Sequence, residues 1–238
     1  MSLPSRMIDY QQTGTDLQAE FVVPDGSGAK RPGVLVAHQW GGRDAFAGDQ
    51  ARRMAQWGYA GFALDMYGAG VMGNSVEENS ALMAPFMADR SRVARRMQAA
   101  LDTLRDQPEV DENRIAAIGF CFGGLCALDL ARSGAEVRAV ASFHGLLKPP
   151  ETRAGKIGAK VLVMHGSDDP LAPLEDVFAL RDEMSAAQAD YQVMIYGNAK
   201  HAFAVPGANN PGIGTLHNVD AERRSMALLR AFLAEALA

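Results

Sequence analysis

The chain has 238 residues, of which 48% are hydrophobic and 21% are charged, a balance typical of globular proteins that excludes an intrinsically disordered chain. The formal net charge of −5 argues against nucleic acid or an acidic membrane surface as a partner. No run of 18 apolar residues and no basic-then-apolar leader occurs, so we expect no spanning helix, no signal peptide and no membrane partner. The two cysteines are not expected to form a disulfide, which fits a reducing compartment, and we expect a cytoplasmic protein. A chain of this length can bury a full core, and residues 1–238 are expected to form one domain.

Apolar runs suited to buried strands alternate with helix-length segments along the chain. An antiparallel edge strand is expected at 17–23, and further strands at 33–38, 59–64, 114–119, 137–143, 160–165 and 191–196. Helices are expected at 45–57, 81–106, 122–133 and 174–187, and an amphipathic stretch at 220–237 closes the chain. This alternation predicts an α/β fold with a mostly parallel sheet covered by helices on both faces.

The loops that follow the predicted strands are the expected location of the functional site. In open parallel sheets, ligands bind beyond the carboxyl ends of the strands. These loops span residues 38–43, 65–74, 144–147, 165–173 and 197–205, together with the turn at Cys121. All the candidate residues described below fall on one of these loops.

The segment Gly-Phe-Cys-Phe-Gly at 119–123 joins the strand at 114–119 to the helix that follows. A glycine on each side, two residues from the central one, avoids a collision where the strand and the helix cross at a sharp turn. This context is typical of the nucleophile elbow of α/β-hydrolases, with Cys121 where serine usually stands. We therefore predict an α/β-hydrolase fold in which Cys121 is the nucleophile.

A cysteine nucleophile needs a base, and the base needs a group that orients it. Asp168 and Asp169, which follow the strand at 160–165, compete for the orienting role. Asp169 is preferred because the usual loop runs Gly-x-x-Asp and reaches a proline four residues later, here Pro173. His201, after the last strand, is the predicted base, and nucleophile, acid and histidine then follow the chain order of an α/β-hydrolase.

Two backbone N–H groups are expected to form an oxyanion hole. One belongs to Phe122, the residue after the nucleophile, at the start of a helix whose dipole favours negative charge. The other comes from the loop at 38–42, where Trp40 is the expected donor. The same helix N-terminus would favour the thiolate form of Cys121.

The remaining histidines and Cys126 have simpler interpretations. His38 is expected to support the turn after the first parallel strand, His165 to bond to the backbone, and His217 to be exposed. His144 ends a strand on the active face, so either a structural role or a contact with substrate remains open. Cys126 is expected in the core, because residues five apart on a helix lie about 140° apart and cannot form a disulfide. No spacing of ligands resembles a metal site, and no cofactor is expected.

The sequence resembles the dienelactone hydrolase family of α/β-hydrolases over about residues 17–237. The resemblance rests on His-Gln-Trp-Gly at 38–41, Gly-Tyr-Ala at 58–60, Leu-Asp-Met-Tyr-Gly at 64–68, the elbow at 119–124, Gly-Ser-Asp-Asp at 166–169 and His-Ala-Phe at 201–203. It implies a Cys121–His201–Asp169 triad that hydrolyses small esters or lactones through a thiol-acyl enzyme. The implied partner is a small-molecule ester or lactone, and we expect a monomer or a weak homodimer.

The chain departs from this family in the groups that hold dienelactone. Family members acting on that substrate carry a glutamate where Gln39 stands, and arginines where Ala69 and Val205 stand. A buried anion without cationic partners binds poorly, so we expect a substrate other than dienelactone itself. Gln39, Tyr67 and His144 are the candidate substrate contacts.

Two further segments give weaker indications of function. The methionine-rich stretch at 66–87 either forms a wall of the pocket or packs beneath a helix. Arg90, Arg92, Arg95 and Arg96 are expected to form a solvated helix face.

Two classes of function follow from these residues. The first is an ester or lactone hydrolase that uses the triad. The second is a non-catalytic binding protein or thiol redox sensor on the same fold, since accessible thiolates oxidise readily. The occupied triad positions favour the enzyme.

Overall fold

An eight-stranded sheet forms the centre of the molecule in the computed structural model, which describes residues 3–24, 28–151 and 155–238. Its strands, in spatial order, are β1 (Ser5–Gln12), β2 (Thr15–Val22), β4 (Ala60–Ala63), β3 (Arg31–Ala37), β5 (Val110–Phe120), β6 (Ala139–Phe143), β7 (Lys160–Gly166) and β8 (Tyr191–Tyr196). All neighbours from β4 to β8 are parallel, whereas β1 and β2 are antiparallel. The mostly parallel sheet predicted from the sequence is therefore confirmed.

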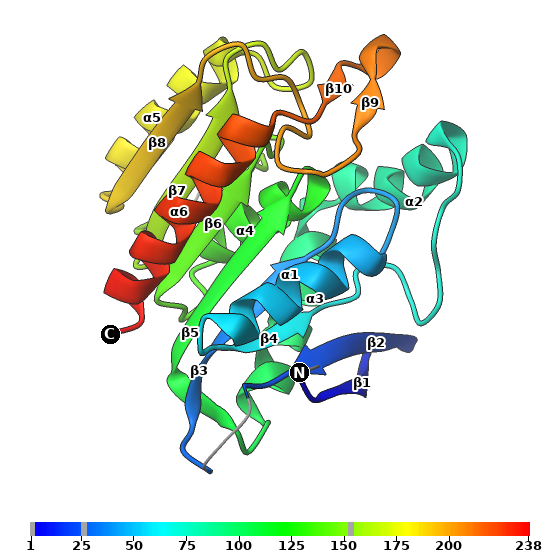
Figure 1. The fold of residues 1–238 in the computed structure, drawn as a ribbon, viewed down its shortest axis with the longest axis vertical. Coiled ribbons are helices and arrows are strands. Elements are labelled where there is room, and N and C mark those ends of the chain that lie inside the picture. The colour runs from blue at the N-terminus through cyan, green and yellow to red at the C-terminus, as the bar shows by residue number, and fades with distance from the viewer. Residues whose placement is uncertain (1–2, 25–27, 152–154) are drawn as a thin grey trace.

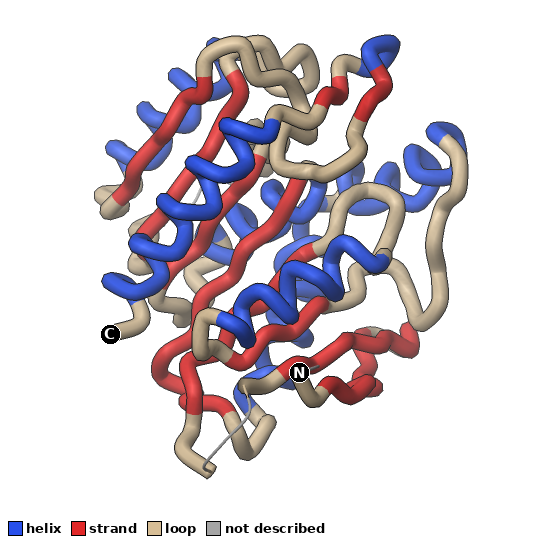
Figure 2. The backbone as a smooth tube through the Cα atoms, viewed as in Figure 1, coloured by secondary structure: helices blue, strands red, loops and turns tan. Residues whose placement is uncertain are grey.

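Helices cover both faces of this sheet. They are α1 (Ala45–Gln56), α2 (Val76–Ala88), α3 (Arg90–Arg105), α4 (Phe122–Arg132), α5 (Leu174–Ala186) and α6 (Val219–Ala236). α1 and α6 cover the face turned to the viewer in Figure 1, while α3, α4 and α5 pack on the other face. Figure 2 shows the strands between these two helical layers.

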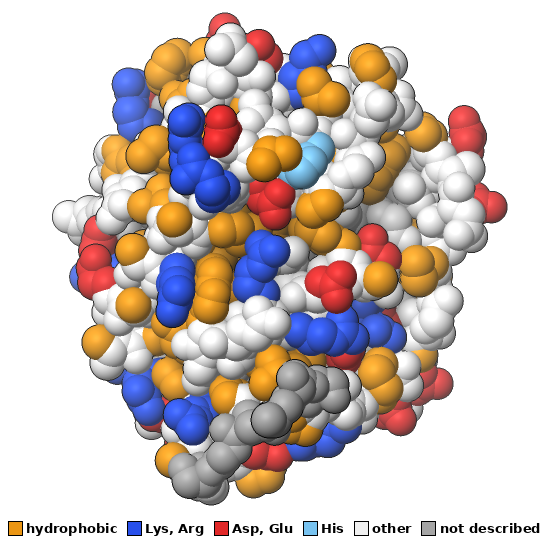
Figure 3. Space-filling view, in the orientation of Figure 1, with side chains coloured by type: hydrophobic (Ala, Val, Ile, Leu, Met, Phe, Trp, Pro, Cys, Tyr) orange, Lys and Arg blue, Asp and Glu red, His pale blue; other side chains and the backbone are white. Residues whose placement is uncertain are grey.

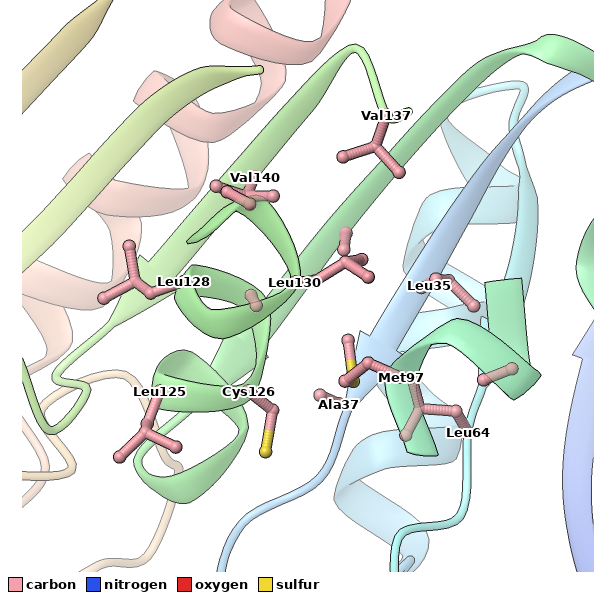
Figure 4. Packing of buried hydrophobic residues seen from close by; sticks show 14 of the residues in the cluster. Leu35, Ala37, Leu64, Met97, Leu125, Cys126, Leu128, Leu130, Val137 and Val140 are labelled. Atoms are coloured by element: carbon pink, nitrogen blue, oxygen red, sulfur yellow. The ribbon is translucent and has the colours of Figure 1, made fainter. Parts of the chain in front are cut away.

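The core is divided by the sheet because successive strand residues point to opposite faces. On β3, Val34 and Val36 pack with α1 and α6, whereas Leu35 and Ala37 pack with α3 and α4. Figure 4 shows Cys126 of α4 on the side of the sheet that α3, α4 and α5 cover, where Cys126 is fully buried, as predicted. Each buried Leu, Val or Phe side chain contributes about 1.5–3 kcal/mol to folding.

The single helix predicted at 81–106 is wrong, because the chain forms two helices there. α2 begins at Val76, after Ser75, whose side chain accepts a hydrogen bond from the backbone N–H of Glu78. Asp89 has extended backbone angles (φ −133°, ψ 92°) and ends α2. Its carboxylate accepts from the N–H of Ser91 (3.0 Å) and so starts α3. An aspartate N-cap, which satisfies an otherwise unpaired N–H, therefore interrupts the helical pattern.

An N-terminal strand and a small hairpin near the C-terminus were not predicted. β1 pairs with β2 along its whole length, so β2 is an internal strand rather than the predicted edge. The largely polar sequence of β1 conceals it, because most of its side chains are exposed. Near the C-terminus, β9 (Asn209–Asn210), the 3-10 helix η1 (Pro211–Ile213) and β10 (Thr215–Leu216) form a small hairpin.

The surface shows no extended area of one charge on the face drawn in Figure 3, where acidic and basic side chains are interspersed. Among the described residues, every helix is too short or too polar to span a bilayer.

Candidate active site

The turn at Cys121 has the geometry of a nucleophile elbow. β5 ends at Phe120, α4 begins at Phe122, and Cys121 between them has φ 56° and ψ −117°, a conformation that side chains rarely adopt. A Cβ on Gly119 would lie 1.9 Å from the carbonyl oxygen of Gly123, and a Cβ on Gly123 would lie 2.2 Å from that of Ala37. The strand and helix can cross this closely only because both positions are glycine.

The predicted base and acid meet at the carboxyl edge of the sheet. His201 follows β8, Asp169 follows β7, and the His201 Nδ1–H donates to Asp169 Oδ2 at 2.8 Å. The other Asp169 oxygen accepts from the N–H groups of Leu171 (2.9 Å) and Ala172 (3.2 Å), which fixes the carboxylate. Asp168, the competing candidate, is exposed and accepts a hydrogen bond from Ser167 instead. The structure thus pairs His201 with Asp169.

His201 lies in an electrostatic environment that favours its protonated form. Burial lowers its pKa, but the negative charge of Cys121 and the hydrogen bond and charge of Asp169 outweigh burial and raise the pKa to about 10. Cys121 is 8% exposed, His201 1% and Asp169 4%, so water screens these charges little. Within the described part of the chain, no group makes a hydrogen bond of standard geometry to Nε2, which leaves this atom for the thiol or a substrate oxygen.

The loop after β3 is held in place by aromatic and hydrogen-bonded contacts. The Tyr67 hydroxyl donates to the carbonyl of Trp40 (2.9 Å), and the Tyr67 ring stacks on Phe122 with centroids 5.8 Å apart. Among the described residues, neither the N–H of Trp40 nor the N–H of Phe122 donates a hydrogen bond. Both donors predicted for the oxyanion hole are therefore free. Gln39 lies on the same loop and is half-buried.

The segment after β4 packs against this loop. Met72 forms an isolated antiparallel bridge with Gly42, and the N–H of Gly73 donates to the carbonyl of Gly41 (3.0 Å). Val71 and Met72 are exposed, by 40% and 46%.

The stretch at 66–87 packs in the core only in part, and a wall of the pocket formed by its other residues stays a prediction. Met66 and Phe86 are buried in the core, whereas Val71, Met72 and Met87 are exposed.

His144 is too deeply buried for the predicted contact with substrate. It has no exposed surface and packs edge-on against His201, with ring centroids 5.1 Å apart, and against Phe203 at 5.2 Å. Its backbone φ is 37°, and Ala202, next to His201, has φ 58°. The structure therefore supports a contact of His144 with His201 rather than with substrate.

The interpretations of the other histidines hold in two of three cases. His38 bonds through Nδ1 to the carbonyl of the next residue (2.5 Å) and accepts through Nε2 from an N–H in the loop after β4 (3.1 Å), so it supports the turn. His165 bonds through Nε2 to a backbone carbonyl (2.8 Å). His217 is half-buried rather than exposed, because its Nε2 bonds to Glu222 (2.7 Å).

Of the four arginines assigned to a solvated helix face, Arg96 is buried and Arg90 is half-buried. Arg96 is 4% exposed and donates to a carbonyl of the loop after β4 (2.9 Å). Arg90 pairs with the buried carboxylate of Asp129 (2.6 Å). Arg92 and Arg95 are exposed, as predicted. The prediction failed because the buried partners come from segments far away in the sequence.

Arg90 belongs to a buried ion-pair network that the sequence did not reveal. Asp129 also contacts Arg132 (3.2 Å), and Arg132 forms a two-point pair with Glu183 (2.9 and 2.7 Å). These residues come from α3, α4 and α5, and the side chains of Asp129, Arg132 and Glu183 are at most 5% exposed. The network therefore fastens the C-terminal half of the elbow helix to its two neighbours.

The chain is similar to several known proteins. The model of the dienelactone hydrolase family matches residues 17–236. The crystal structure of a dienelactone hydrolase-like promiscuous phosphotriesterase from metagenomic libraries is 40% identical, with a TM-score of 0.95 and full coverage of both chains. A Salmonella typhimurium protein named as a candidate carboxymethylenebutenolidase is 27% identical over 202 residues, which cover 80% of this chain and 74% of that protein.

A more distant structure, of an α/β-hydrolase enzyme from a Medee basin deep-sea metagenome, shares the fold at 20% identity, with a TM-score of 0.70 and coverage of 100% and 99% of the two chains. The predicted α/β-hydrolase fold is thus confirmed. Since the family model spans nearly all of the chain, the protein belongs to the dienelactone hydrolase family.

Proposed function

We propose that the protein hydrolyses small, uncharged carboxylic esters or lactones, with Cys121 as the nucleophile. The observation that carries this proposal is the buried hydrogen bond between His201 and Asp169, on the same sheet edge as the strained Cys121 turn. Family membership supports a hydrolase, and the name of the Salmonella typhimurium relative supports a lactone or ester bond as its target.

The proposed reaction begins with attack of the Cys121 sulfur on the carbonyl carbon, while the carbonyl electron pair moves onto oxygen. The N–H groups of Trp40 and Phe122 stabilise this oxyanion, and the N-terminus of α4 adds a favourable dipole. Collapse of the intermediate expels an alkoxide, which takes a proton from His201 Nε2. Asp169 stabilises the charged imidazole until that transfer.

The resulting thioester is then hydrolysed. Neutral His201 removes a proton from water, the hydroxide oxygen adds to the thioester carbon, and the Cys121 thiolate leaves as the carboxylic acid forms. His201 ends the cycle protonated, and the carboxylic acid loses its proton to solvent and leaves as carboxylate, so one water is consumed for each ester bond broken. No metal or cofactor takes part in these steps.

The substrate is proposed to be uncharged because the chain carries neutral residues where family members place charged ones. Gln39, Ala69 and Val205 supply no cation and no carboxylate. Cys121 has only 8% of its surface exposed, which favours a small acyl group. Val71 and Met72 add exposed apolar surface beside the loop that carries Trp40.

A second candidate substrate is an uncharged phosphotriester. The relative with 40% identity is described as a promiscuous phosphotriesterase. The neutral residues listed above suit a phosphotriester as well as an ester, since neither carries a charge. Attack of Cys121 at phosphorus would expel the alcohol and leave a phosphorylated thiol for water to cleave.

The test is hydrolysis of a short-chain nitrophenyl ester and a nitrophenyl phosphotriester by wild-type protein and Cys121→Ala. Cys126→Ala is the matched control, because it removes the other thiol, which is buried in the core. Turnover that is lost in Cys121→Ala but kept in Cys126→Ala supports the proposal. Release of nitrophenol that does not depend on Cys121, or saturable binding without turnover, would refute it and favour the binding-protein alternative.

A further inference from the structure

We infer that His144 is a positioning residue whose ring holds the imidazole of His201 in the orientation that faces Cys121. This inference rests on the proposed function. It assigns a role to a buried side chain that the proposed reaction does not otherwise use.

The place of His144 in the sheet brings it to the reacting groups. It follows β6, which lies between β5, the strand before Cys121, and β7, the strand before Asp169. Its N–H donates to the carbonyl of Met164 on β7 (2.9 Å), which fixes the backbone. With φ 37°, this backbone has a conformation that side chains rarely adopt, and such strain gathers at functional sites.

The hydrogen bond to Asp169 restrains the plane of the His201 ring only in part. The Nδ1–Asp169 bond, at 2.8 Å, holds one ring atom, and packing against the rest of the ring limits its remaining rotation about the side-chain bonds. The ring of His144 blocks this movement, since it stands edge-on to His201 at 5.1 Å and 66°. Phe203 and Phe120 also pack against His144, with centroids at 5.2 Å and 6.0 Å from its ring.

The contact acts through the shape of the ring rather than through its nitrogens. In the described part of the chain, neither nitrogen of His144 has a hydrogen-bond partner, whereas His165, one strand away, bonds through Nε2 to the carbonyl of Ala172 (2.8 Å). Burial, followed by the charge of His201, lowers the pKa of His144 well below its ordinary value. The ring therefore stays neutral and does not repel a protonated His201.

The test compares His144→Ala with His144→Phe, which keeps a planar ring, both in a Cys126→Ala background with Cys121 as its single thiol. Two rates are measured: alkylation of Cys121 by iodoacetamide, and hydrolysis of the nitrophenyl ester. In His144→Ala we expect alkylation and kcat to fall by about tenfold with little change in KM, because the base is misplaced rather than the substrate. His144→Phe is expected to restore most of both rates.

Leu128→Ala is the matched control for lost stability, because Leu128 is equally buried but packs in the core. It should lower Tm without slowing alkylation. Alkylation of a folded His144→Ala at the wild-type rate would overturn the inference, and so would a folded His144→Phe as slow as His144→Ala. If His144→Ala does not fold, His144→Gln replaces it as the variant without a ring, with the same expected loss.

The alkylation readout separates this inference from the proposed function. Absence of ester turnover in the wild-type protein would count against the proposed function. Slower alkylation in His144→Ala, with recovery in His144→Phe, would still support the positioning role, because that readout needs no ester.

Discussion

Replacing Cys121 with alanine should lower the pKa of His201. In the intact site that pKa is about 10, against an ordinary value of 6.5, which corresponds to about 5 kcal/mol in favour of the protonated ring. Burial opposes protonation, and the charge of Cys121 is the largest contribution that favours it, ahead of Asp169. Without the sulfur, Asp169 alone works against burial. We therefore expect the pKa to fall by at least one pH unit, or about 1.4 kcal/mol.

The measurement is an NMR titration of the imidazole nitrogens in wild-type protein, Cys121→Ala and Cys121→Ser. His201→Gln identifies the His201 signal by its absence. The serine variant restores a side chain of similar size without a negative charge, so it should behave like the alanine variant. A pKa that stays near 10 in both would show that Asp169 alone holds the proton, and the reasoning about a thiolate–imidazolium pair would fail.

Three further changes test the site and its support. Asp169→Asn should lower kcat by at least about 100-fold, because His201 loses the group that sets its tautomer, while Asp168→Asn should stay close to wild type in the same steady-state assay. Glu183→Ala should reduce the free energy of unfolding in urea by about 3–5 kcal/mol, because it leaves a buried arginine charge underpaired. The exposed neighbour Asp182 serves as the control, since Asp182→Ala should change the free energy of unfolding by about 0.5 kcal/mol or less. Equal losses of stability in Asp182→Ala and Glu183→Ala would show that burial of the ion pair does not matter. Gly123→Ala should fail to give a native circular dichroism spectrum, since the added Cβ would overlap a backbone oxygen. A native spectrum would show that the elbow helix can move away from the strands to make room for it.

The parallel part of the fold was predictable because its signals are local. The apolar runs of β3 and β5 to β8, and the glycines at 119 and 123, each report a strand or a crossing within a few residues. β1 was missed because its stability comes from pairing with β2, and its own side chains are mostly polar and exposed.

The positions of Cys121, Asp169 and His201 were predictable for a related reason. Each follows a strand that the sequence reveals, and parallel strands bring their carboxyl ends to one edge. What the sequence could not supply were contacts between distant segments. Arg90 meets Asp129 across 39 positions, and Arg132 meets Glu183 across 51, so no local pattern predicts these two ion pairs.

The strained backbone at the site has a consequence for attempts to make this protein more heat-resistant. Cys121, His144 and Ala202 all have positive φ, and residues other than glycine are destabilised there by about 1–3 kcal/mol each. Cys121→Gly would relieve one such strain, so a screen that selected only for survival of heating would favour variants that have lost the proposed nucleophile. Stability and turnover compete at this turn, and directed evolution of the protein needs to select for both together.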